Sequence, residues 1–260
     1  MRILVWNLKG AFGSSEESHA AAWNYLRAQP FDVALLQETR DPAGYADWCS
    51  SIWRPKYANS QIRRILWGTA VVSRSVELIE PELDDSLPWL RELQGSTAIA
   101  SVDGDPTWFA SVHAHTAPIN SRKIEELGSD QIPVSTPDGS IWETDVIPFE
   151  LHRLFGDQSF VWGGDLNSAV VMDESPRFTG GNGRLRKTWR EAGSHDLRLD
   201  FFKDEQQTFF APRRGAYQLD HLFADEATSR RVTAWRVDRT PVELDPPLSD
   251  HAPIIAEIGV

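Results

Sequence analysis

The chain of 260 residues carries 26 basic and 38 acidic side chains, which gives a formal net charge of −12. Hydrophobic residues make up 41% and charged residues 25%, which excludes extended disorder and collagen-like repeats. This length fits one large β-sandwich or α/β barrel, so we expect a single domain over residues 1–260. The lone cysteine, Cys49, excludes an internal disulfide and a thiolate metal site, which favours a cytoplasmic location.

The acidic balance argues against a protein that holds nucleic acid by bulk electrostatic attraction. It leaves nucleic-acid chemistry open, because a local basic surface and metal ions can offset a carboxylate-lined site. The segment 176–190 has such a surface, with no acidic residue, although a solvated helix face beside a glycine-rich loop explains it equally well. Its basic residues are Arg177, Arg184, Arg186, Lys187 and Arg190. No apolar run is long enough for a membrane span or a secretion signal.

Short runs of β-branched, aromatic and aliphatic residues predict about ten strands. They lie at residues 3–8, 33–37, 65–72, 97–102, 108–112, 160–162, 208–211, 217–224, 232–237 and 253–258. Helical patterns occur at 16–28, 41–51, 142–155 and 185–192, with Ser14 and Glu17 as a capping box before the first. Residues 117–140, with three prolines, predict surface loops. Many strands with few helices between them predict two packed sheets covered by helices.

Polar side chains suited to chemistry follow directly on several of these strands. Singly, each is explained by a turn, a helix cap or a hydrogen-bonded histidine, but together they favour a site. Oxygen ligands at strand ends suit Mg²⁺, whereas no cluster of the structural zinc type is present in the sequence. The residues are Asn7, Glu38, His113, His115, Asp165, Asn167, Asp220, His221, Asp250 and His251.

Six short blocks, in this order, resemble the endonuclease/exonuclease/phosphatase superfamily of metal-dependent phosphodiesterases. They are WN at 6–7, LLQE at 35–38, HAHTAP at 113–118, GGDLN at 163–167, LDH at 219–221 and LSDH at 248–251. The histidine before Thr116-Ala117-Pro118 is similar to the pancreatic-type deoxyribonuclease, sphingomyelinase and inositol-phosphatase members rather than to exonuclease III. The resemblance implies an α/β fold, a four-layered α/β sandwich of two packed, mainly antiparallel β-sheets flanked by helices.

The resemblance also implies a metal site that holds one or two Mg²⁺ or Mn²⁺ ions. Glu38 is the expected principal ligand, and Asn7 is expected to complete the shell of the ion directly or through water. Asp250 is expected to lie behind these ligands or to bind a second ion. The number of ions stays open at this point.

The remaining residues of the blocks take catalytic roles by the same resemblance. Asp165 is expected to orient or deprotonate the attacking water, and Asn167 to donate its amide to a non-bridging phosphate oxygen. His251 is the expected catalytic histidine, as general base or as a proton-bearing stabiliser, and Asp220 is expected to hold its other ring nitrogen. His221 faces the opposite side of a regular strand from Asp220, so we expect it to be structural.

His113 and His115 compete for one further role, the stabilisation of the phosphate and the leaving group. We choose His115, because the Ala-Pro pair that follows it fits the family pattern. Many relatives carry an arginine near Gln218, so one phosphate contact is missing or replaced here. The candidate substrate-binding side chains are Arg74, Arg177, Arg184, Arg186, Lys187 and Arg213.

The 11 tryptophans include some within strand runs, which we expect to pack in the core or at a groove edge. Three others lie in less regular segments and are the better candidates for a substrate wall: Trp89, Trp142 and Trp189.

The favoured hypothesis is a Mg²⁺- or Mn²⁺-dependent phosphodiesterase, with DNA or RNA as the leading substrate because segment 176–190 follows the GGDLN block. An alternative substrate is a phospholipid head group, an inositol phosphate or another small phosphoester, which the net charge slightly favours. A catalytically silent binding module is disfavoured, because every expected catalytic position holds a competent residue. The sequence predicts no protein partner.

Overall fold

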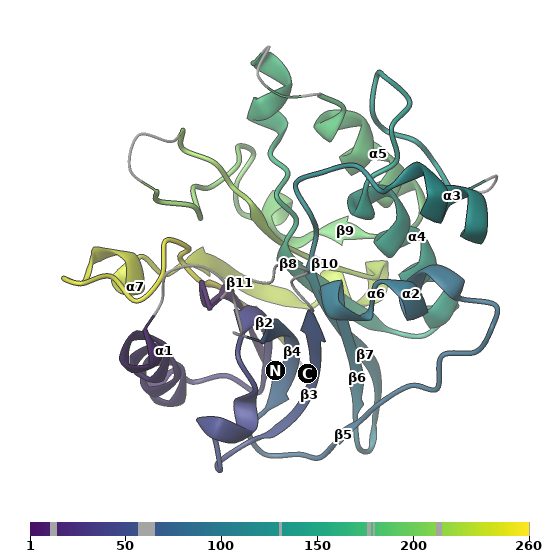
Figure 1. Cartoon of the computed structure of the whole chain (residues 1–260). Coiled ribbons are helices and arrows are strands. Elements are labelled where there is room, and N and C mark those ends of the chain that lie inside the picture. The colour runs from purple at the N-terminus through teal and green to yellow at the C-terminus, as the bar shows by residue number, and fades with distance from the viewer. Residues whose placement is uncertain are drawn as a thin grey trace.

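The computed structural model describes residues 1–10, 15–56, 66–129, 132–175, 178, 180–211 and 215–259. Two six-stranded β-sheets pack face to face, and helices cover their outer faces (Figure 1). The predicted α/β sandwich is therefore confirmed.

The first sheet has the strand order β11-β12-β1-β2-β4-β3. Its strands are β1 (Arg2–Asn7), β2 (Val33–Thr39), β3 (Ser50–Lys56), β4 (Trp67–Ser73), β11 (Val232–Val237) and β12 (Ile254–Ile258). Only β1 and β2 run parallel to each other, and the other neighbouring pairs of this sheet are antiparallel. The carboxyl ends of β1 and β2 therefore meet at one edge.

The second sheet repeats this arrangement with the order β5-β6-β7-β8-β10-β9. Its strands are β5 (Leu78–Ile79), β6 (Thr97–Val102), β7 (Asp105–His113), β8 (Phe160–Asp165), β9 (His195–Asp196) and β10 (Asp220–Ala224). Its one parallel pair is β7 with β8, which again brings two carboxyl ends to one edge.

Alternation along the strands decides which side chains enter which layer. On β1, Ile3 and Val5 point into the layer between the sheets, where they are fully buried with Phe109 and Val161. The intervening Leu4 faces the cluster under α1. Each sheet therefore buries both faces, which explains why its strands read as continuous apolar runs.

The described residues form helices α1 (Glu16–Ala28), α2 (Pro88–Glu92), α3 (Ser121–Leu127), α4 (Glu143–Phe155), α5 (Asn182–Glu191), α6 (Glu226–Ser229) and α7 (Thr240–Glu243). They also form 3₁₀ turns at Pro42–Gly44, Gln94–Ser96, Val170–Glu174 and Leu197–Asp200. Trp23 and Leu26 of α1 pack on the first sheet, whereas α2, α4 and α5 pack on the second. No helix among the described residues is long and apolar enough to cross a membrane.

Three predicted elements differ from the structure. Residues 41–51 hold a short 3₁₀ turn and the start of β3 instead of a helix, because pairing with β4 along its whole length outweighs the local helix signal. Residues 208–211 form no strand and make only isolated bridges from Phe209. Residues 117–140 contain α3 in addition to loops.

The start of α1 is shifted by one residue from the predicted capping box. Ser15 caps this helix, its hydroxyl accepting from the backbone N–H of Ser18 at 3.1 Å. The predicted cap, Ser14, lies outside the described residues.

Candidate active site

The polar side chains of the sequence blocks gather at one edge of the sandwich. Both parallel pairs end at this edge, and the antiparallel β10 begins there, with Asp220 paired in register to Asp165. The side chains that the fold brings together are Asn7, Glu38, His113, Asp165, Asp220 and His251. Each sheet has one parallel strand pair at its centre, and the two pairs thus place residues from six separate segments in one cluster.

The two sheets are joined by side chains directly beneath this cluster. The Ser111 hydroxyl donates to the Leu36 carbonyl at 2.8 Å and accepts from Gln37 Nε2 at 2.9 Å. Gly164, at φ +147°, permits this close approach, because a Cβ there would lie 2.9 Å from Gln37 Nε2 of the other sheet. Tight packing at this point fixes the distance between the ends of the two parallel pairs.

Backbone strain is concentrated at the site. Lys9, Glu38 and Asn167 have φ values of 54°, 47° and 48°, and no other non-glycine residue in the described part of the chain has a positive φ. Such conformations cost free energy and persist where the surroundings enforce them. Here they turn the chain sharply at the ends of β1, β2 and β8, so that the side chains face the cluster.

His251 lies between two carboxylates. Its Nδ1 is 2.8 Å from Asp220 Oδ2, and its Nε2 is 3.7 Å from Asp165 Oδ2. Burial lowers the pKa of His251, but the charges of Asp220 and Asp165 outweigh burial and raise this pKa to about 10. Burial raises the pKa of Asp165 to about 7, against the opposing effect of His251. The ring is therefore an imidazolium at neutral pH.

Asp165, Asp220 and His251 also offer ligand atoms close enough together to hold a metal ion. In this structure His251 Nδ1 already faces Asp220 Oδ2 at 2.8 Å. Asn7 joins Asp165 of this cluster to Glu38, so the Glu38 carboxylate lies beside the three residues.

Asn7 connects the predicted metal ligand Glu38 with the predicted catalytic residue Asp165. Its Nδ2 donates to Asp165 Oδ2 at 2.9 Å and to Glu38 Oε1 at 3.5 Å, and its Oδ1 accepts from the backbone N–H of Lys9 at 2.8 Å. Ser249 braces the same place, because its hydroxyl donates to the Asn7 carbonyl at 2.7 Å. The Glu38 carboxylate is a hard oxygen donor, which fits Mg²⁺ or Mn²⁺, whereas Asn7 turns its amide nitrogen toward Glu38 and Asp165.

The two competing histidines occupy different depths. His113 is buried at the centre, with Nε2 3.6 Å from Glu38 Oε1 and 3.9 Å from Asp165 Oδ2. His115 is exposed at the cavity wall, and its backbone N–H donates to Glu143. The structure thus places His113 beside the acidic groups and leaves His115, the residue chosen from the sequence, at the mouth.

The other two predicted residues are engaged by the chain itself. Asn167 donates its side-chain amide to the Ala114 carbonyl at 2.9 Å, which leaves its second amide hydrogen for a substrate. Asp250 does not join Glu38, and instead pairs with Lys9 at 3.0 Å.

A cavity of about 610 Å³ opens over the cluster. Beyond the acidic groups, its walls are mostly aromatic and aliphatic: Trp67, Trp142, Leu166, Met172, Phe178, Leu185, Phe209, Tyr217 and Leu219. Trp142 is thus a wall residue as predicted, whereas Trp89 and Trp189 are buried in the core. Trp67, expected in the core or at a groove edge, lines the cavity and contacts the ring of His113.

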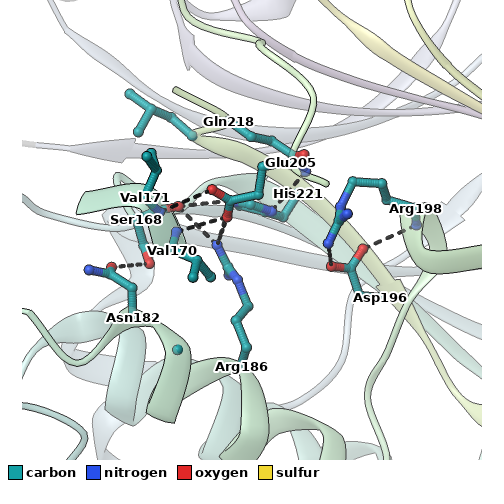
Figure 2. Close-up of polar contacts among 12 residues, drawn as sticks. Ser168, Val170, Val171, Asn182, Arg186, Asp196, Arg198, Glu205, Gln218 and His221 are labelled. Atoms are coloured by element: carbon teal, nitrogen blue, oxygen red, sulfur yellow. Dashed lines mark hydrogen bonds and ion pairs between the residues drawn. The ribbon is translucent and has the colours of Figure 1, made fainter. Parts of the chain in front are cut away.

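The structure removes two of the predicted basic contacts from the site. Arg74 donates to carbonyls at the end of α1, at the opposite end of the first sheet from Asn7. Arg186 points inward from α5, where it contacts the Ser168 carbonyl, Glu205 and His221 (Figure 2). Both guanidinium groups donate to groups of the chain itself, because buried carbonyl oxygens need hydrogen-bond donors and a guanidinium is a strong one.

His221 fills the structural role expected from the sequence pattern. Its Nε2 lies 2.9 Å from the Ser168 carbonyl and its Nδ1 lies 3.0 Å from Gln218 Nε2, so this network holds the chain that follows Asn167 (Figure 2). Arg184 and Lys187 are exposed on α5. Arg177 and Arg213 lie outside the described residues.

Sequence reasoning missed several residues that shape the site. Lys9 and Ser249 stand within two residues of predicted site positions, but their types gave no signal of their own. Thr208 accepts the backbone N–H of Asp220 at 3.1 Å, and Lys56 donates to Ser96 at 2.7 Å near Trp67. Only contacts between distant segments show these roles.

Comparison of the sequence and the fold with known proteins identifies the family of this chain. The model of the Endonuclease/Exonuclease/phosphatase family matches residues 4–251. An AP endonuclease from Archaeoglobus fulgidus has a similar structure, with TM-score 0.72, 17% identity and 100% of both chains covered. The 3′ phosphatase NExo from Neisseria, bound to a product DNA hairpin, has TM-score 0.67, 19% identity and 100% of both chains covered.

The AP endonuclease LMAP from Leishmania major is also similar, with TM-score 0.66, 16% identity, and coverage of 100% of this chain and 87% of that one. No curated protein matches the sequence. At these identities the structures show a shared fold, whereas the family model matches almost the whole sequence. The chain belongs to the endonuclease/exonuclease/phosphatase family.

Proposed function

We propose that this protein is a divalent-metal-dependent phosphodiesterase that hydrolyses nucleic acid. The observation that carries the proposal is the buried arrangement of Asp165, His251 and Asp220 beside the oxygen donors of Glu38 and Asn7. Family membership supports phosphoester hydrolysis by such a set.

Glu38 and Asn7 are the residues that we propose to hold the metal ion. The fit rests on the Glu38 carboxylate, a hard oxygen donor of the kind that Mg²⁺ and Mn²⁺ prefer. The Asn7 amide oxygen, which accepts from the backbone N–H of Lys9, would join the shell of the ion directly or through water. When bound, the ion supplies Lewis-acid polarisation of the phosphate.

Asp165 is the proposed general base for the attacking water. A carboxylate is a weak base in water, but burial raises the pKa of Asp165 to about 7, which suits proton transfer at neutral pH. Asn7 donates to the Oδ2 of the same carboxylate and thereby fixes its orientation. Water attack on phosphorus would then pass its proton to Asp165, while the bond from phosphorus to the leaving oxygen breaks and that oxygen takes a proton from water.

His251 is the proposed proton-bearing stabiliser. Its Nδ1 is held by Asp220, which leaves the Nε2 proton directed toward the reacting groups near Asp165. The free amide hydrogen of Asn167 supplies a second donor for a phosphate oxygen. His115 lies at the cavity wall, where it would contact the leaving group. Donors placed in advance of the reaction stabilise the added negative charge of the transition state.

Nucleic acid is the substrate that we propose, because the cavity places aromatic rings next to the acidic cluster. Trp67, Trp142, Phe209 and Tyr217 offer flat faces on which bases stack. A small phosphoester is the second candidate. It is favoured by the net charge of −12 and by the internal use of Arg74 and Arg186.

Salt dependence separates the two substrates. We expect kcat/KM on single- and double-stranded DNA or RNA to fall about tenfold between 50 and 200 mM salt, because about two phosphate contacts would each release a condensed counterion on binding. Hydrolysis of bis(p-nitrophenyl) phosphate should change little. Neutralising Arg184 and Lys187 together to glutamine should flatten the salt dependence on nucleic acid. The matched control is Arg230→Gln, at an exposed residue directly after α6 that pairs with Glu226. Turnover of inositol phosphates or phosphocholine lipids without cleavage of nucleic acid would eliminate the nuclease proposal.

A further inference from the structure

Lys9 stands beside an acidic residue of the active site. The ammonium of Lys9 lies 3.0 Å from Asp250 Oδ2, and both residues line the cavity. The Lys9 side chain is 44% exposed and the Asp250 side chain 23%. The ammonium therefore contacts Asp250 and still faces the space in which a substrate would bind.

The backbone holds Lys9 firmly in this place. Leu8 N–H donates to the Gln37 carbonyl at 2.9 Å, and Gly10 N–H donates to the Glu38 carbonyl at 2.7 Å. A Cβ on Gly10 would lie 2.1 Å from that carbonyl oxygen, so only glycine permits the contact. Lys9 itself is held at φ 54° between these two anchors. The strained segment is thus bonded to the end of β2, which also carries Glu38.

We infer that the ammonium of Lys9 is a built-in cation that takes the place of a second divalent ion on Asp250, so that the site binds one ion. The inference rests on the proposed function. The geometry that carries it is the 3.0 Å ion pair, because the carboxylate that the resemblance offered to a second ion already has a fixed cation beside it.

The position of Lys9 also suits transition-state stabilisation. Hydrolysis adds negative charge to the phosphate, and a fixed cation beside it lowers the barrier. A lysine ammonium is a compact point charge with three donors, so it can keep Asp250 and contact a phosphate oxygen at once. Asp250 is then the residue that orients Lys9, instead of a metal ligand.

The number of bound Mn²⁺ ions tests the inference without using activity. It can be counted by calorimetry and by the loss of the free Mn²⁺ signal in electron paramagnetic resonance. We expect one ion per wild-type chain, one ion per Asp250→Asn chain, and two ions per Lys9→Asp chain, in which two carboxylates become available. A rate assay adds a second readout. Lys9→Met should lose about 10²-fold in kcat relative to the wild type, and Lys9→Arg should lose less than Lys9→Met. Arg230→Met, at an exposed helical ion pair, should match the wild type in both measurements.

The outcomes also separate this inference from the proposed function. Two Mn²⁺ ions on an active wild-type chain, or a lower count in Asp250→Asn, would overturn the role of Lys9 and leave the phosphodiesterase proposal intact. A wild-type chain that binds no ion and hydrolyses no phosphodiester would overturn both. Because the metal counts of wild type and Asp250→Asn need no Lys9 variant to fold, the test does not depend on the stability of those variants.

Discussion

Asp165→Asn is expected to lose at least about 10³-fold in kcat on phosphodiester substrates while the protein stays folded. Asparagine keeps the size of the side chain and the contact with Asn7, but it cannot accept the proton of the attacking water. The measurement is hydrolysis at saturating Mg²⁺ by wild type and variant. The exposed Asp157→Asn is the matched control, and we expect it to retain full activity.

The same variant should be more stable than the wild type when metal is removed. Burial raises the pKa of Asp165 to about 7 in the folded chain, above its value of about 3.9 in unfolded chains. The raised pKa favours folding below pH 3.9, and this contribution is lost as pH rises through about 7. We therefore expect the stability gain to be larger at pH 8 than at pH 5, as measured by urea unfolding. A variant that retains activity within tenfold would remove Asp165 from the role of base.

Asp220→Asn is the second large change, with an expected loss of about 10³ to 10⁴-fold in kcat, by analogy with the carboxylate behind the histidine of hydrolase triads. Burial alone lowers the pKa of His251, and the charge of Asp220 is the largest effect that raises it to about 10. The variant should therefore lower the pKa of this histidine. Residual activity should fall as pH rises through the neutral range, where wild-type His251 keeps its proton.

The pKa of His251 can be followed by NMR titration of its ring together with the pH profile of kcat. The exposed Asp200→Asn serves as the control and should leave both curves unchanged. An Asp220→Asn protein with the wild-type pKa of His251 would contradict the account of this pair, whatever its activity.

The sequence predicted the architecture well because apolar runs of strand length are strong local signals. The strands that carry Asn7, Glu38 and Asp165 at or near their carboxyl ends were found, and the two sheets bring these polar ends to one edge. β3 was missed, because Ser50–Lys56 has a mixed composition and forms a strand through its pairing with β4. Strand formation of this kind depends on a partner that is distant in the chain.

The site was less predictable where contacts between segments decide a role. His113 and His115 differ by only two residues, yet the strand ends at His113 and leaves His115 exposed. Arg186 appeared in a basic segment, but its orientation toward Glu205 and Ser168 follows from how α5 packs. Lys9 belongs to no sequence motif, and its role beside Asp250 is seen only from the 3.0 Å contact between the two side chains. Charge counted along the sequence does not reveal which charges are already paired.

The most direct test of the central claim is the relaxation of supercoiled plasmid by purified protein with Mg²⁺ or Mn²⁺. Chelator and His251→Ala are the parallel controls. The account predicts nicking that is lost in both controls, since the metal ion and the imidazolium at Asp220 are both required. Nicking that persists in chelator, or an inactive wild type that is folded and supplied with metal, would contradict it.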